Sequence, residues 1–162
     1  MNGKSKWYVF AGVAGIIITG VMITLCSKRE TEWKKLSDLQ ECKNMFESSI
    51  TEMTLRETID HPEWVEFQDE DLIKMWTCYF NELEVKEYNA PFGENQLGNG
   101  GSNVITVQTE QGKIVFVKCF ISNEIMMDIN GKIYKIKEKE GMPFKETYNV
   151  AVTRYGTHSV FD

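Results

Sequence analysis

The side chains that most often carry out chemistry in proteins are few in this chain and lie far apart in the sequence. His61 and His158 are the two histidines, and neither has another histidine or a cysteine at the short spacing of a zinc site. Carboxylates gather at Glu63, Glu66 and residues 69–71, yet they lack the alternating ligands and glycine turn of a calcium loop. We therefore predict no metal site, no cofactor and a solvated surface at these acids.

No nucleophile or phosphate motif stands out in the sequence. Neither Gly-x-Ser-x-Gly nor Ser-x-x-Lys occurs, and there is no Walker pattern. The stretch NAPFGENQLGNGGSN at 89–103 is rich in glycine and asparagine, but it has no lysine and follows an expected helix. Phosphate loops instead lead from a strand into a helix, so we interpret this stretch as a flexible connector. With no catalytic residue to name, the sequence favours a protein that is not an enzyme.

Four cysteines, Cys26, Cys42, Cys78 and Cys119, are spread along the chain without a Cys-x-x-Cys pair. That spacing argues against the thioredoxin motif and most zinc ribbons. Cys119 lies in an apolar stretch and is expected to be a small core residue. Disulfides persist outside the cell, and Cys42 could pair with Cys78 because Cys78 falls on the polar side of an expected helix. Two separate thiols are the alternative.

A membrane span is the clearest prediction from the first part of the chain. Residues 7–26, WYVFAGVAGIIITGVMITLC, contain no charged side chain. As a helix they would extend about 30 Å, the thickness of the hydrocarbon core of a bilayer. Lys4 and Lys6 precede the run and form a short positive segment. We interpret residues 1–6 as a cytoplasmic tail and residues 7–26 as a transmembrane signal anchor.

Two other interpretations of the apolar run stay open. A signal peptide would be cleaved after it, although the run is longer than usual and no Ala-x-Ala-like site follows. A lipoprotein would carry its lipid on Cys26, although Leu25 is a poor fit where a small residue is expected. Within the run, Ala11, Gly15 and Thr19 recur every four residues, and small residues on one ridge let two helices approach for weak self-association.

Charge is divided unevenly along the chain. The formal net charge is −6, from 18 basic and 24 acidic residues. Lys4 and Lys6 are the two basic residues before residue 27, and no acidic residue lies there. The remaining acidic part lacks the basic clusters that neutralise phosphates, so we predict no nucleic-acid partner. Basic residues flank the apolar run on both sides. The short N-terminal tail therefore decides the orientation, and we predict a single-pass protein of the cell membrane with its C-terminal domain extracytoplasmic.

Hydrophobic spacing indicates two helices and two strands between residues 27 and 85. Residues 30–46 have an apolar residue every three or four positions, which predicts a juxtamembrane helical stalk over 27–47. Weak alternation favours strands at 48–59 and 64–68. Acidic residues 69–71 then cap a helix. Its apolar face gathers six residues, Leu72, Ile73, Trp76, Tyr79, Phe80 and Leu83.

The second half of the sequence predicts hairpins. Asn130-Gly131 separates two alternating runs, and Asn-Gly is the strongest short hairpin signal because both residues adopt positive φ readily. A short loop that ends at Gly112 joins another pair of runs. The expected strands are 104–109, 113–121, 124–129, 132–138 and 147–155.

These elements predict an α+β fold. We expect an antiparallel β-meander sheet with one amphipathic helix, the one that begins at residue 69, packed on a face of it. The corresponding domain would be extracytoplasmic and span 48–155, with a C-terminal tail at 156–162. The aromatic residues that lie close together in this part of the sequence would then belong to the core and not to a ligand cage. They are Trp64, Phe67, Trp76, Tyr79 and Phe80.

One resemblance adds to this interpretation. The apolar N-terminal run, the helix DEDLIKMWTCYFNEL and the stretch GKIVFVKCFISNEIMMDINGKIYKI resemble small membrane-anchored or lipoprotein-like domains of unknown function from Gram-positive bacteria. The resemblance covers most of residues 48–138 and is one of pattern. It implies an extracytoplasmic β-rich module without known catalytic residues.

The sequence thus predicts a membrane-anchored extracytoplasmic protein of non-enzymatic type. Its expected partners are the membrane, through residues 7–26, and a protein or peptide at the cell surface, because a sheet with an exposed edge suits such contacts. The alternatives are a lipoprotein-like accessory or sensor domain of the envelope, or an envelope enzyme with an unrecognised site.

Overall fold

The chain divides into two compact units, Met1–Glu32 and Trp33–Asp162. The computed structural model describes residues 32–58, 61–88, 102–121 and 124–160. The expected span at 7–26 lies outside these ranges, together with Ala11, Gly15, Thr19 and Cys26. Residues 89–101, which make up most of the glycine-rich stretch, lie outside them as well. Among the described residues, no helix has both the length and the apolar character to cross a membrane.

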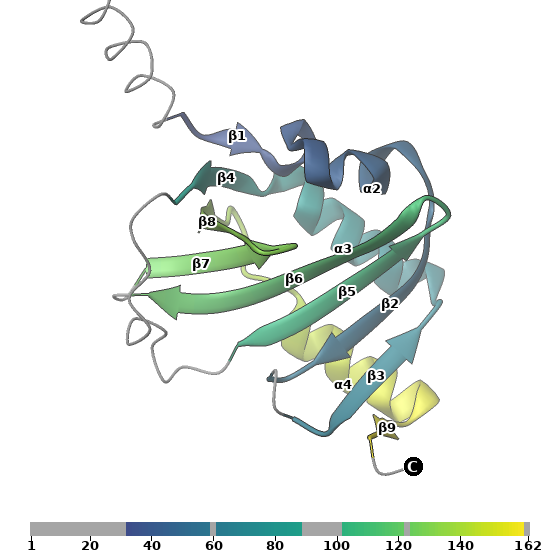
Figure 1. Cartoon of the computed structure of the whole chain (residues 1–162). Coiled ribbons are helices and arrows are strands. Elements are labelled where there is room, and N and C mark those ends of the chain that lie inside the picture. Colours follow the sequence, from purple (N-terminus) through teal and green to yellow (C-terminus); the bar gives the residue numbers. More distant parts are fainter. Residues whose placement is uncertain (1–31, 59–60, 89–101, 122–123, 161–162) are drawn as a thin grey trace, which may run out of the picture. The chain divides into compact units, whose positions relative to one another are not determined.

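The second unit is built on a mostly antiparallel sheet, as the α+β prediction requires (Figure 1). Within the described residues the sheet has nine strands, and each paired neighbour runs antiparallel. From one edge to the other they are β1 (Lys34–Lys35), β4 (Glu84–Glu87), β8 (Lys132–Lys137), β7 (Glu124–Ile129), β6 (Gly112–Ile121), β5 (Asn103–Thr109), β2 (Ile50–Arg56), β3 (Glu63–Phe67) and β9 (His158–Ser159).

The predicted hairpins are confirmed. Asn130 (φ 50°) and Gly131 (φ 88°) turn the chain between β7 and β8, and both lie in the left-handed region that a tight hairpin needs. The Asp128 carboxylate accepts a hydrogen bond from the backbone N–H of Gly131 at 2.6 Å. Consecutive strands β5 to β8 therefore form the expected meander at the centre of the sheet.

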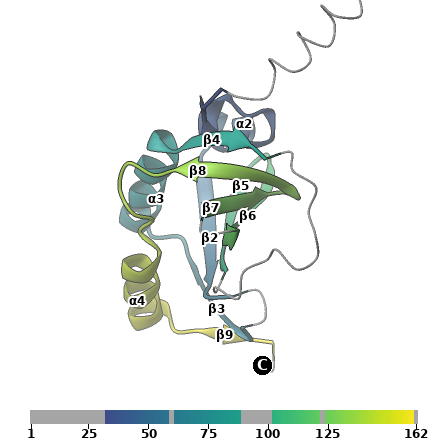
Figure 2. The ribbon, with the colours of Figure 1, turned by 90° about the vertical axis from the view of Figure 1, so that its left-hand side faces the viewer.

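The amphipathic helix predicted after residue 69 is α3 (Glu70–Glu82). Asp69 caps it, because its carboxylate accepts hydrogen bonds of 3.1 Å from the backbone N–H groups of Asp71 and Leu72. Leu72, Trp76 and Phe80 of its apolar face are buried. The helix therefore covers one face of the sheet, as the spacing of its apolar residues predicts (Figure 2).

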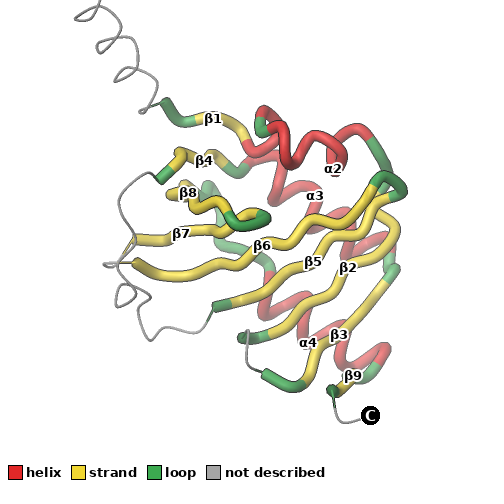
Figure 3. The backbone as a smooth tube through the Cα atoms, in the orientation of Figure 1, coloured by secondary structure: helices red, strands yellow, loops and turns green. Residues whose placement is uncertain are grey.

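The prediction of a fifth strand at 147–155 is wrong. These residues belong to a second long helix, α4 (Phe144–Tyr155), which lies on the same face of the sheet as α3 (Figures 2 and 3). Val150 and Val152 produce a local alternation, but the buried positions are Phe144, Thr147 and Ala151, at helical spacing. The sheet is thus covered by two helices instead of one.

The prediction of a helical stalk over 27–47 is also wrong for residues 34–47, which the structure describes. Residues 34–47 form β1, two 3-10 turns (Leu36–Asp38 and Gln40–Cys42) and the short helix α2 (Lys43–Glu47). Leu36 donates its backbone N–H to the carbonyl of Leu83 at 2.9 Å, so tertiary pairing overrides the helical stripe. Of the apolar residues in the stripe, Leu36, Cys42 and Met45 are buried in the core of the second unit, whereas Trp33 is 42% exposed.

Aromatic packing between α3 and the middle of the sheet forms the centre of the core. The rings of Phe80 on α3 and Phe116 on β6 stack with their centroids 4.8 Å apart. Trp76 lies one turn earlier on α3, and its ring centroid is 5.6 Å from that of Phe80. All three side chains are fully buried, so they account for a large share of the hydrophobic stabilisation.

We predict that Phe116→Ala lowers the free energy of unfolding by about 3–5 kcal/mol, because it leaves a cavity beneath α3. Phe120 lies on the same strand but is 42% exposed, which makes Phe120→Ala the matched control. That variant is expected to change stability by about 1 kcal/mol or less. Chemical denaturation of both variants measures the difference. Equal losses would show that the core is centred elsewhere.

Candidate functional site

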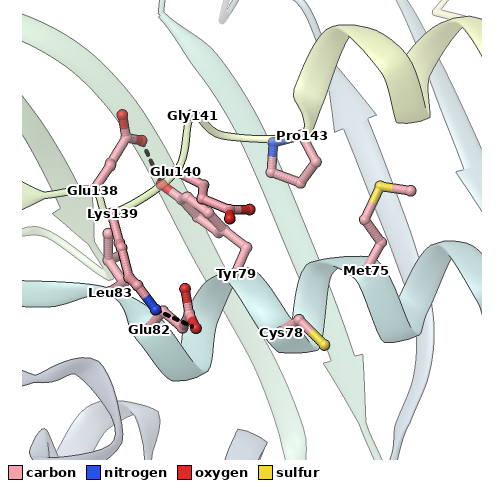
Figure 4. A pocket seen from close by; sticks show the side chains of 10 residues that line it. All are labelled: Met75, Cys78, Tyr79, Glu82, Leu83, Glu138, Lys139, Glu140, Gly141 and Pro143. Carbon is pink, nitrogen blue, oxygen red and sulfur yellow. Dashed lines mark hydrogen bonds and ion pairs between the residues drawn. The ribbon is translucent and has the colours of Figure 1, made fainter.

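A cavity of about 350 Å³ lies between α3 and the connection from β8 to α4. Figure 4 shows the side chains around it, with Tyr79 and Cys78 on the helix and residues 138–141 and Pro143 on the connection. The wall is mixed, because Met75 and Leu83 are apolar while Glu82 and Glu138 are acidic. Such a mixture is the usual composition of a ligand pocket.

Glu138 joins three elements of the fold beside this cavity. Its Oε1 atom accepts a hydrogen bond from the Tyr79 hydroxyl at 2.6 Å and lies 2.8 Å from the Lys118 Nζ atom. The Lys118 and Glu138 side chains are 13% and 12% exposed. Both charges are therefore largely removed from water and depend on each other for compensation. We call this set the Glu138 network.

The chemistry open to the Glu138 network is limited. Burial raises the pKa of Tyr79 well above its ordinary value, and the hydrogen bond to Glu138 raises it further. The phenol consequently stays protonated and does not act as a base near neutral pH. Lys118 and Glu138 are already paired, so these groups cross-link α3, β6 and the connection after β8 instead of presenting a reactive atom.

A second surface lies on the face of the sheet opposite α3 and α4. A shallow hollow of about 460 Å³ extends over β2, β3, β5 and β6. We call it the open-face hollow. Its lining combines acidic, basic, amide and hydroxyl groups with one aromatic ring and two valines: Glu52, Thr54, Arg56, Trp64, Glu66, Val104, Thr106, Gln108, Lys113 and Val115.

Trp64 is the central aromatic group at the β3 side of the open-face hollow. The Arg56 guanidinium carbon lies 5.3 Å from the centre of the indole ring, a cation–π distance. The His158 imidazole stacks on the same indole with centroids 5.8 Å apart. His158 is paired with Trp64 across β3 and β9. The row Arg56–Trp64–His158 thus presents planar groups beside hydrogen-bonding side chains, a combination suited to binding peptides.

Near β6, β7 and β8, the sheet face opposite α3 and α4 carries buried apolar side chains instead of a polar hollow. Cys119, Ile121 and Met126 form a small buried cluster, against which Tyr88 and Ile133 pack. Burial, and then the charge of Asp128, raise the pKa of the Cys119 thiol. The prediction that Cys119 is a small core residue is therefore confirmed.

Cys42 and Cys78 are separate free thiols in the structure. Cys42 is fully buried, and burial raises its pKa to about 12, with a further contribution from the charge of Glu41. Cys78 is exposed on α3, on the polar side that the sequence predicts. Cys42 therefore behaves as a small core side chain, and Cys78 is the accessible thiol of the pair.

The acidic and histidine side chains noted in the sequence lie apart. Within the ranges that the structure describes, no three His, Cys, Asp or Glu residues come close enough to hold a metal ion. Asp69 caps α3, and its pKa is lowered by the hydrogen bond from the backbone N–H of Leu72 and then by Tyr155 and Arg154. His61 contacts the backbone of Glu63 at 3.3 Å, whereas His158 belongs to the row beside Trp64.

The sequence does not predict the row Arg56–Trp64–His158. It places His158 in a C-terminal tail and Trp64 in the core, whereas His158 lies in β9 and Trp64 is half-buried in the open-face hollow. Alternation in the stretch TEMTLR does place Glu52, Thr54 and Arg56 on one face of a strand. It does not say which strand lies next to β2, and that neighbour is what brings Trp64 beside Arg56.

Comparisons with protein-family models, with curated proteins and with solved structures find no match to this chain. The function of this protein is therefore inferred from the geometry of the cavity beside α3 and of the open-face hollow.

We predict that Glu138→Gln lowers the free energy of unfolding by about 3 kcal/mol, because it leaves the buried Lys118 ammonium without its counter-charge. The control is Glu84→Gln, which removes an exposed ion pair with Lys137 (42% and 66% exposed) and should cost at most about 1 kcal/mol. Adding Lys118→Met to Glu138→Gln should recover part of the loss. Denaturation curves that show equal costs for Glu138→Gln and Glu84→Gln would contradict the prediction.

Proposed function

We propose that this protein is a membrane-anchored, extracytoplasmic binding protein without enzymatic activity, and that it binds a protein or peptide partner through the open-face hollow. The observation that carries the proposal is the asymmetry of the sheet. Both long helices cover one face, while the other face carries a hollow lined by mixed polar groups around Trp64. Partly exposed aromatic residues ringed by polar groups are characteristic of interaction surfaces.

The alternative of an envelope enzyme receives less support from the geometry. Tyr79 and Glu138 line the cavity beside α3, and Glu138 binds both the Tyr79 hydroxyl and the Lys118 ammonium. A catalytic acid or base needs a pKa near the operating pH and access to a substrate proton. The raised pKa of Tyr79 moves in the wrong direction for a base.

The anchoring part of the proposal rests on the uncharged run at residues 7–26. Cys78 offers a direct test of the side on which the second unit lies, because it is exposed. We expect a membrane-impermeant maleimide to label Cys78 on intact protoplasts. Cys42 should be labelled only after denaturation, because the buried thiol with its raised pKa provides little thiolate. Peptide mass spectrometry assigns the labelled position.

Two results of this labelling would contradict the expectation. Labelling of Cys78 only after lysis would place the second unit in the cytoplasm. Labelling of both Cys42 and Cys78 only after reduction would show that the two form a disulfide. That result would contradict the two free thiols of the structure.

The binding part of the proposal is tested by photo-crosslinking in cells. A p-benzoylphenylalanine in place of Thr106, in the open-face hollow, should give one discrete crosslinked product. Trp64→Ala should reduce its yield roughly tenfold or more, the typical effect of losing an aromatic residue that anchors an interface. The control position is Thr153, exposed on α4. Equal crosslinking from Thr106 and Thr153, or no effect of Trp64→Ala, would refute binding through the hollow.

A further inference from the structure

The segment that follows α4 adds a short strand to the edge of the sheet. In β9, Ser159 pairs with Glu63 and His158 pairs with Trp64, both antiparallel. Val160 then donates its backbone N–H to the carbonyl of Pro62 at 3.1 Å. The edge of β3 therefore demonstrably accepts an extended segment through backbone pairing, the basis of β-strand addition.

The end of α4 determines where this segment starts. Tyr155 donates its hydroxyl to the Asp69 carboxylate at 2.9 Å, and Arg154 forms an ion pair with the same group. Gly156 (φ 77°) then ends the helix in a conformation that other residues seldom adopt. Since Asp69 follows β3 by two residues, these contacts keep the start of β9 close to the strand on which it pairs.

The pairing between β9 and β3 involves few residues. Among the described residues that follow α4, His158 and Ser159 are the two that pair with β3, whereas β5 and β6 pair along the whole of β5. Val160 is 60% exposed, and His158 is exposed as well. Among the described residues, no strand pairs with the outer side of Val65–Phe67, the remaining part of β3. A pairing this short is marginal in water without further support.

We propose that the outer edge of β3 is the docking site for an extended peptide segment of the partner, and that residues 156–160, from the end of α4 through β9, occupy this edge in the free protein and are displaced on binding. This inference rests on the proposed function and specifies how the partner is recognised. The tethered segment competes at a high effective concentration, so the partner must make contacts that β9 does not.

The register of the edge indicates what those contacts are. Because Trp64 lies opposite His158 in an antiparallel pair, a partner residue at the position of His158 stacks on the indole. Two residues earlier, at the position of Gly156, a partner side chain would lie opposite Glu66, which is exposed on the same face of β3. A basic residue there forms a cross-strand ion pair. The expected motif is therefore basic-x-aromatic in an extended segment.

The test uses the full chain in detergent and a fluorescent peptide, Lys-Thr-Trp-Ser-Val, followed by anisotropy up to millimolar protein. His158→Ala with Val160→Pro removes the stacked ring and the N–H that bonds to Pro62. The matched control, His158→Phe with Val160→Ala, keeps a planar ring and that N–H. We expect the first double variant to bind roughly tenfold or more tightly than both the control and the unsubstituted chain, because its competing segment is released.

A second peptide, Glu-Thr-Trp-Ser-Val, tests the recognition of charge. It should bind the released edge several-fold more weakly than the lysine peptide, since like charges opposite each other are destabilising. Amide hydrogen exchange on the unsubstituted chain gives an independent measurement. The N–H of Val160 should exchange at least roughly a hundredfold faster than that of Val107 in the central strand β5.

Three results would overturn the inference. These are equal affinity of the lysine peptide for all three forms, no binding by the released form, and protection of Val160 equal to that of Val107. If the edge fails in this way while crosslinking from Thr106 persists, the proposed function stands without the edge. If the peptide binds at the edge of β3 but Thr106 gives no crosslinked product, the edge is a binding site and the open-face hollow is not.

Discussion

The contact between the aromatic face of α3 and the central strands is the constraint on which the rest of the fold depends. Phe80 stacks on Phe116, and Trp76 lies against Phe80, all fully buried. A sheet with one apolar face is stable only when that face is covered. Once α3 lies across the middle strands, α4 covers the part near β3, and the polar residues of β2, β3 and β5 are directed to the opposite side.

Much of this arrangement follows from local pattern. The meander from β5 to β8 is specified by turn residues such as Asn130 and Gly131, whose conformation no distant contact needs to impose. The start of α3 is equally local, because Asp69 satisfies N–H groups within three residues of itself. The sequence could predict these elements because their cause is contained in a few neighbouring residues.

Other elements depend on partners that are distant in sequence. Residues 36–46 have helical spacing, but Leu36 pairs with the end of α3 and its neighbours fill the core. In α4, the burial of Thr147 and Ala151 decides between helix and strand where Val150 and Val152 suggest alternation. The row Arg56–Trp64–His158 is likewise made by the order of β2, β3 and β9. The order of the strands is not determined by residues that are neighbours in the sequence, so the open-face hollow could not be predicted from local patterns.

The positions of β1 and β9 have a consequence for distance. They are the two outermost strands of the sheet among the described residues, with the first described strand at one edge and the last at the other. With strands spaced about 4.8 Å apart, nine strands extend roughly 40 Å from edge to edge, somewhat less with twist. A molecule held beside β9 is therefore separated from β1 by the full width of the sheet. The sheet acts as a lateral spacer whose reach is determined by its number of strands.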